Sequence, residues 1–202
     1  MIDFISVFVF FFAVIDPIGT VPVFIAVTSQ YDERTKRKIA LNATLVSALI
    51  LVFFIIAGEY ILTAMDIPLA AFQIAGGLVL FLFAISMIFG ESKPEQEVKV
   101  TTKEDETAIF PLAVPYIAGP GSILTAVLLT EHARNTFWEQ AQITVTMLSV
   151  LLVVFVLMLS ASSVYRFIGS SGASIISRVM GLILASMATA NVLAGIKVYF
   201  AL

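Results

Sequence analysis

Asp16 is the residue in this sequence whose type and surroundings point most directly to chemistry. It is the only charged residue between Phe4 and Gln30, in a stretch made mostly of Phe, Val and Ile. A carboxylate at membrane depth is costly, so such residues commonly mark a path for ions, protons or polar substrates. A buried carboxylate can pair with a substrate ammonium group and can also take up and release a proton. Asp16 is therefore a candidate both for substrate binding and for proton coupling.

The residues next to Asp16 predict that the helix carrying it is broken. The 27 residues from 4 to 30 would make a helix of about 40 Å, whereas the hydrocarbon layer of a bilayer is roughly 30 Å thick. Pro17 has no amide hydrogen to donate, and Gly19 relaxes the backbone. The Asp16 carboxylate can accept hydrogen bonds from amides of the following turn. We therefore expect a half-helix that begins inside the membrane with Asp16 as its cap.

A second interruption is expected over residues 111–122, which contain Pro111, Pro115 and the Gly-Pro-Gly motif at 119–121. Gly-Pro-Gly does not easily continue a helix, and glycines let a ligand approach open backbone amides. A helix that starts here leaves its first amides and the Ser122 hydroxyl open to an anion. We expect its positive dipole end to converge with that of the half-helix starting at Pro17.

The two helix starts differ in charge, and this difference fits a zwitterion. Asp16 would lie near a substrate ammonium group, and the open amides of the second break would lie near its carboxylate. No Lys or Arg lies within a span to pair with a second substrate charge, apart from Arg178 and Lys197 near the ends of the last one, which favours small neutral amino acids. The candidate substrate-binding residues are Asp16, Pro17, Gly19, Thr20, Asn42, Gly119, Pro120, Gly121, Ser122 and Thr125.

Each of these features also has a purely structural interpretation. Asp16 could cap a kinked helix without contacting a substrate. Gly119 and Gly121 could serve only for close helix packing, which is a common use of small residues in membranes. Four hydroxyl side chains on the second and fifth spans are expected to form hydrogen bonds between helices rather than to bind substrate. They are Thr44, Ser47, Thr146 and Ser149.

Composition indicates the class of protein. Hydrophobic residues make up 60% of the 202 residues and charged residues only 12%, and the apolar runs are too long for the core of a soluble domain. The net charge of −3 is small and predicts neither a nucleic-acid surface nor a polybasic lipid-binding patch. Hydrolytic or metal catalysis usually needs a metal cluster, a Ser/His pair or paired carboxylates. This chain has one histidine, no cysteine and one acid expected to be buried. We therefore expect an integral membrane protein that is not an enzyme and uses no cofactor or metal.

The apolar runs predict an all-α membrane protein of six transmembrane helices in two repeats. Residues 1–90 form the first three-helix repeat, 91–107 a polar linker, and 108–202 the second repeat. Weak self-similarity at a shift of 102 to 105 residues supports this division. Because each repeat has three spans, the two insert in opposite orientations, a common plan for transporters. The expected spans are 4–30, 39–63, 68–90, 108–130, 140–164 and 174–200, of which the first and fourth are interrupted.

The positive charges predict how the chain lies in the membrane. Nine of the eleven Lys and Arg residues fall in the loop 31–38, in the linker 91–107, or beside the fifth connection at Arg166 and Arg178. The positive-inside rule places these three connections in the cytoplasm and both termini outside. The expected location is the cytoplasmic membrane.

Five short motifs, spread over both halves, resemble those of a known family. They are residues 16–22 (DPIGTVP), 111–115 (PLAVP), 119–121 (GPG), 178–184 (RVMGLIL) and 195–196 (GI). The pairing of Asp-Pro-x-Gly with Gly-Pro-Gly, in halves of this length, is similar to the MarC family of integral membrane proteins across essentially the whole chain. The resemblance implies six spans and a relationship to transporters of the lysine-exporter type. An archaeal branch of that family is described as transporting glycine and alanine, which is the substrate class that the resemblance implies.

These features together predict a secondary transporter that moves small neutral amino acids across the membrane by alternating access. Its expected partners are the amino-acid substrate, the lipid bilayer and, through Asp16, protons. Export of other small metabolites, a channel and a non-transporting scaffold are the alternatives. Import and export share one architecture, so both directions stay open.

Overall fold

The elements of the computed structural model are helices throughout the part of the chain that it describes, residues 3–89, 107–131 and 136–200. Five spans in these residues are long and apolar enough to cross a membrane, and the bent pair η2 and α6 makes a sixth. The expected six-span, all-α architecture is thereby confirmed, while all of the linker 91–107 except Thr107 lies outside the described residues. The elements are α1 (Phe4–Ile15), α2 (Pro17–Thr28), α3 (Glu33–Ala64), α4 (Leu69–Phe89), η2 (Ala108–Ile117), α6 (Pro120–Leu129), α7 (Phe137–Leu159) and α8 (Ala161–Tyr199).

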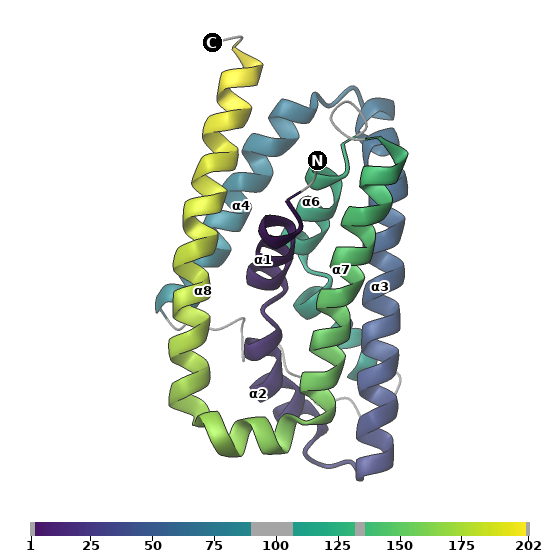
Figure 1. The fold of residues 1–202 in the computed structure, drawn as a ribbon, viewed down its shortest axis with the longest axis vertical. Helices are drawn as coiled ribbons and strands as arrows, with labels where there is room; N and C mark the ends of the chain where they lie inside the picture. The colour runs from purple at the N-terminus through teal and green to yellow at the C-terminus, as the bar shows by residue number, and fades with distance from the viewer. Residues whose placement is uncertain (1–2, 90–106, 132–135, 201–202) are drawn as a thin grey trace.

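The two halves of the chain run through the bundle in opposite directions (Figure 1). In the first half α1 and α2 descend, α3 rises and α4 descends, whereas in the second half η2 and α6 rise, α7 descends and α8 rises. The loop after α2 and the corner between α7 and α8 therefore lie at the same end of the molecule. This is the relative placement that the charge pattern predicts for these two of the three basic connections. The side of the membrane that this end faces stays a prediction.

The fourth span is interrupted as the sequence predicts, and its irregular backbone begins one residue earlier than expected. A helix was expected over 108–130 with an interruption over 111–122. In the structure η2 contains extended backbone at Val114 (φ −129°, ψ 127°), inside that stretch, and at Phe110 (φ −129°, ψ 123°), one residue before it. Each of these residues precedes a proline across a cis peptide bond, and a residue before proline is disfavoured in the helical conformation. Regular helix begins at Pro120, where α6 is bent by 54° from η2.

The connection between the last two spans also differs from expectation. The fifth span was expected to reach residue 164, but α7 ends at Leu159 and α8 begins at Ala161. The first turns of α8 lie across the end of the bundle in Figure 1, and the backbone at Gly169 (φ 70°, ψ 173°) turns the chain into the part of α8 that spans the membrane. Glycine adopts a positive φ at little cost because it has no Cβ. The segment before it therefore becomes a separate helix along the end of the bundle.

Four hydroxyl groups expected to bond between helices bond within their own helices instead. Each donates to a backbone carbonyl three or four residues earlier, at 2.6 to 2.9 Å. A hydroxyl in an apolar surrounding can always reach such a carbonyl, so it needs no partner on a neighbouring helix. An interhelical bond does occur where Gln73 Nε2 of α4 donates to Asn191 Oδ1 of α8 at 3.4 Å. The four hydroxyls belong to Thr44, Ser47, Thr146 and Ser149.

Short α6 packs inside the bundle against α1, α3 and α4. Small residues on the surrounding helices allow this close approach. A Cβ on Gly76 of α4 would overlap the Leu124 side chain of α6, and a Cβ on Gly58 of α3 would overlap that of Val127. The position of α6, and hence of the Gly-Pro-Gly break at its start, is therefore fixed by glycines on its neighbours.

Substituting Gly76 by valine is expected to destabilise the protein by about 1–3 kcal/mol, because overpacking forces α4 and α6 apart. The measurement is the thermal unfolding temperature of the purified protein in detergent. Ala75→Val is the matched control, since Ala75 is exposed on the neighbouring face of α4. Equal unfolding temperatures for the two variants would contradict this account of the packing.

Candidate functional site

Asp16 stands at the break of the first span and caps the helix that follows it. Its backbone is left-handed (φ 52°, ψ 67°) and its side chain is only 4% exposed. Its Oδ1 accepts a hydrogen bond from Gly19 N at 3.0 Å, and its carbonyl accepts one from Thr20 Oγ1 at 2.9 Å. Aspartate is among the few residues other than glycine that tolerate this conformation, because its short side chain can bond to the local backbone. The predicted cap and the predicted break are both present.

The other oxygen of the same carboxylate is held by a distant helix. Ser177 Oγ of α8 donates to Asp16 Oδ2 at 3.2 Å. Asp16 is thus positioned from two sides, by the first turn of α2 and by α8. Its capping role is structural, and its roles in substrate binding and proton coupling stay predictions.

Gly19 contacts both the Asp16 carboxylate and Tyr116 of the second broken span. A Cβ on Gly19 would overlap Oδ2 of Asp16, so the carboxylate can fold back over the first turn of α2 only because this side chain is absent. The Gly19 carbonyl accepts a hydrogen bond from Tyr116 Oη of η2 at 2.7 Å. Tyr116 is 7% exposed and lies three residues before the second break. This contact joins the two broken spans directly.

The start of α6 differs from the start of α2 in having no side-chain cap. Gly119 occupies the N-cap position there, with Pro120 as the first helical residue. The Ser122 hydroxyl turns back and donates to Ile117 O at 2.8 Å. A Cβ on Gly121 would lie 2.8 Å from Leu80 Cδ2 and 3.1 Å from Val14 Cγ1. In this conformation, therefore, apolar side chains cover Gly121, and Ser122 satisfies a carbonyl freed by the break.

Thr125 carries the unsatisfied polar group of this region. Its side chain is 1% exposed, and its Oγ1 has no hydrogen-bond partner among the residues that the structure describes. Residues three and four apart share one face of a helix, so Thr125 lies one turn along α6 from Gly121 and Ser122. Buried hydroxyls without partners are rare in folded proteins. This hydroxyl is therefore available to a ligand or a water molecule that enters between the helices.

The predicted site residues are brought together with one clear exception. The residues of the first break, 16–20, lie beside those of the second, because Val14 packs on Gly121 and Tyr116 bonds to Gly19. Asn42 does not join them, since its side chain is exposed on α3 while Ala40 and Ala43 face inward. The helical period that buries residues 40 and 43 turns residue 42 outward.

Sequence reasoning missed two residues of this site. Tyr116 lies within the second interrupted segment and could have been singled out as the only hydroxyl-bearing aromatic there. Ser177 gave no comparable signal in the sequence. It lies 161 residues from Asp16 in the chain, and only the tertiary fold brings the two side chains together. Within the described residues, no three His, Asp or Glu side chains gather as metal ligands would.

The fold and this site define a multi-pass α-helical membrane protein with a buried carboxylate where two broken spans meet. A family model described as MarC family integral membrane protein matches residues 1–200. The chain therefore belongs to the MarC family.

Similar proteins occur in archaea and bacteria and match along nearly their whole length. A UPF0056 membrane protein of Methanocaldococcus jannaschii is 35% identical over 197 residues, covering 96% of each chain. The UPF0056 inner membrane protein YhgN of Escherichia coli K12 is 32% identical over 199 residues, covering 98% of each chain. A UPF0056 membrane protein of Aquifex aeolicus is 33% identical over 198 residues, covering 96% of this chain and 92% of the relative. No solved structure matches this chain.

Proposed function

We propose that this protein is a secondary transporter that moves small neutral amino acids across the cell membrane by alternating access. The observation that carries the proposal is the hydrogen bond from Tyr116 Oη to Gly19 O, which joins the two broken spans beside the buried carboxylate of Asp16. In transporters built from inverted halves, substrate binds near the midplane between interrupted helices. The opposite helix directions of the two halves in Figure 1 fit that plan.

The charges at the two breaks support a zwitterionic substrate. Asp16 supplies a negative charge for a substrate ammonium group. The start of α6 has no side-chain cap, so its first amides and its dipole favour the substrate carboxylate. The Thr125 hydroxyl, which has no partner among the described residues, supplies a neutral hydrogen bond one turn further along α6.

The packing at the breaks supports a small substrate and a closed state. Leu80 and Val14 cover Gly121, so a ligand reaches the α6 start only if these side chains withdraw. A substrate with a hydrogen or a methyl side chain requires the smallest movement, which favours glycine and alanine. Release of the Tyr116 to Gly19 bond would let the two halves separate and open the site to one side.

Counterflow in proteoliposomes tests the proposal. Vesicles loaded with unlabelled alanine are expected to accumulate radiolabelled alanine or glycine with saturation. Propionate, which lacks the ammonium group, and ethylamine, which lacks the carboxylate, are expected to compete weakly. Rapid flux without counterflow would indicate a channel, and no flux of either amino acid would overturn the proposed substrate class.

Replacing Thr125 by valine is expected to weaken transport while leaving the fold intact. The hydroxyl forms no bond with a described residue in this state, so its loss should not lower the unfolding temperature. A neutral hydrogen bond to substrate contributes about 0.5–1.5 kcal/mol, so the substrate concentration for half-maximal counterflow should rise roughly 2- to 12-fold. The control is Thr63→Val, which removes an exposed hydroxyl near the end of α3. Unchanged half-saturation in Thr125→Val would remove this residue from the proposed site.

A further inference from the structure

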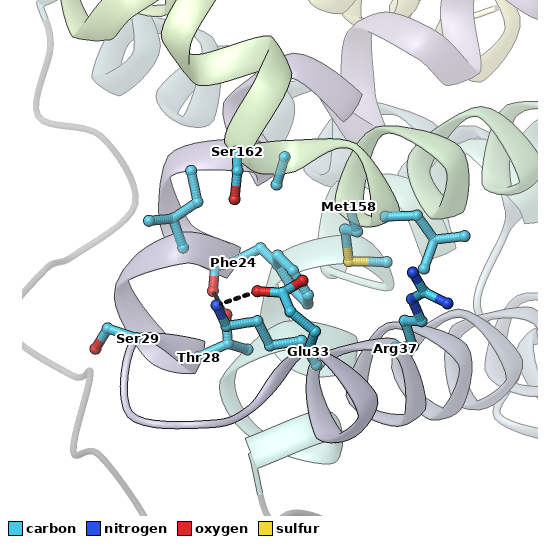
Figure 2. A pocket seen from close by; sticks show the side chains of 11 residues that line it. Phe24, Thr28, Ser29, Glu33, Arg37, Met158 and Ser162 are labelled. Atoms are coloured by element: carbon cyan, nitrogen blue, oxygen red, sulfur yellow. Dashed lines mark hydrogen bonds and ion pairs between the residues drawn. The ribbon is translucent and has the colours of Figure 1, made fainter.

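A pocket lies away from the two breaks, at the end of the bundle that carries the loop after α2. It opens between the last turns of α2, the first turns of α3 and the corner between α7 and α8, and has a volume of about 60 Å³. Figure 2 shows Arg37 of α3 and Ser162 of α8 reaching it from different helices. One water-sized probe needs roughly 10–15 Å³, so the pocket holds a group of about five non-hydrogen atoms, which is the size of a phosphate.

The charges around the pocket favour an anion. Glu33 is neutralised by Lys36, whose Nζ lies 2.9 Å from Glu33 Oε1. Arg37 forms no ion pair with any other residue that the structure describes, and its exposed guanidinium stands at the pocket. Two acids and four cations in residues 31–38 leave this loop with a net charge of +2. An arginine fork matches the geometry of phosphate oxygens, and the Ser162 side chain lies in the same lining. The Thr28 hydroxyl already donates to the Phe24 carbonyl.

The surroundings favour a lipid over a dissolved ion. The pocket's inner wall is apolar, with Phe24, Met158 and Leu159, while its charged groups come from the loop end of α3. The first turns of α8 lie across this end of the bundle (Figure 1), with Arg166 exposed and Phe167 93% exposed. A helix that presents both an apolar ring and a cation in this way is typical of the membrane interface, where phosphate headgroups lie.

We propose that this pocket binds the phosphate of a single anionic phospholipid, with Arg37 as its main ligand. The acyl chains of that lipid would lie along the exposed apolar side chains beside the pocket. This is a site for one headgroup, built by three helices, and differs from a polybasic patch, which the small charge of the chain argues against.

Binding of short-chain lipids to the purified protein in neutral detergent tests the proposal. Native mass spectrometry is expected to show binding of dihexanoyl phosphatidylglycerol that Arg37→Gln weakens at least tenfold, since a hydrogen bond to a charged group contributes that much or more. Arg34→Gln and Lys38→Gln remove the same charge from the same helix and are expected to weaken binding less than threefold. Ser162→Leu fills the pocket from α8 and is expected to weaken binding as Arg37→Gln does.

The competing ligands separate the possible occupants. Equal binding of dihexanoyl phosphatidylcholine would show that only the apolar wall matters and would overturn the anion site. Displacement of the lipid by equimolar glycerol phosphate or inorganic phosphate would identify a soluble anion as the occupant and overturn the lipid. If Arg37→Gln, Arg34→Gln and Lys38→Gln weaken lipid binding equally, the lipid is attracted by the overall charge of the loop and not bound by this pocket.

Discussion

Asp16→Asn is expected to abolish most substrate binding without unfolding the protein. Asparagine caps helices as well as aspartate does and tolerates the same left-handed backbone, so the break and the cap should persist. The substitution removes the negative charge expected to face the substrate ammonium group. Losing one partner of a buried charged pair costs about 2 kcal/mol or more, so alanine counterflow should need roughly 30-fold more substrate. Any dependence of uptake on a proton gradient should disappear as well.

Asp66 provides a matched control for this experiment. It is an aspartate with almost the same positive φ, 53° against 52° for Asp16, but its side chain is exposed in the loop between α3 and α4. Asp66→Asn therefore makes the same chemical change outside the site and is expected to transport normally. If Asp16→Asn takes up alanine as well as Asp66→Asn does, with its proton dependence intact, Asp16 is only a helix cap.

Gly19→Ala is expected to damage both stability and transport. The added methyl group would overlap the Asp16 carboxylate, so the carboxylate must leave its bond to Gly19 N or α2 must shift. Loss of an N-cap costs about 1 kcal/mol, and movement of Gly19 also disturbs its bond from Tyr116. We expect a lower unfolding temperature in detergent. We also expect counterflow to fall by more than the amount of folded protein falls.

Gly172→Ala serves as the comparison for Gly19→Ala. A Cβ at residue 172 of α8 would approach only the side chain of Ile168, at 2.6 Å, and neither residue lies at the breaks. The Ile168 side chain must shift to make room, so this variant should also lose stability, but its counterflow per folded protein should stay intact. Normal transport and stability in Gly19→Ala would mean that the carboxylate does not need its present position.

Much of the fold could be predicted because the relevant signals are local. A long apolar run must form a helix in a membrane, since no water is present to satisfy its backbone. Proline, glycine and a buried aspartate interrupt such runs through the geometry of a few neighbouring residues, as at Asp16 and at Pro120. Local sequence was less exact at the start of the fourth span, where the extended backbone begins at Phe110, one residue before the expected interruption.

The relative placement of the helices was much harder to predict, for a reason specific to membranes. Side chains that face lipid are as apolar as those that face the core, so the pattern of hydrophobic residues does not reveal which face of a helix turns inward. On α3, Leu45 is 53% exposed and Leu51 is fully buried, although both are leucine. Because the inward face of α3 was not evident from the sequence, Asn42 was predicted as a ligand, whereas its side chain is exposed in the structure.

The sequence by itself determined that this chain is a six-span membrane protein, that its first and fourth spans are broken, and that Asp16 caps the helix after the first break. These features depend on composition and on residues within one turn of each other. The tertiary structure alone decided that Tyr116 bonds to Gly19, that Ser177 holds Asp16, and that Leu80 and Val14 close over Gly121. Each of these contacts joins residues far apart in the chain, and only the packing of specific helix faces brings such residues together.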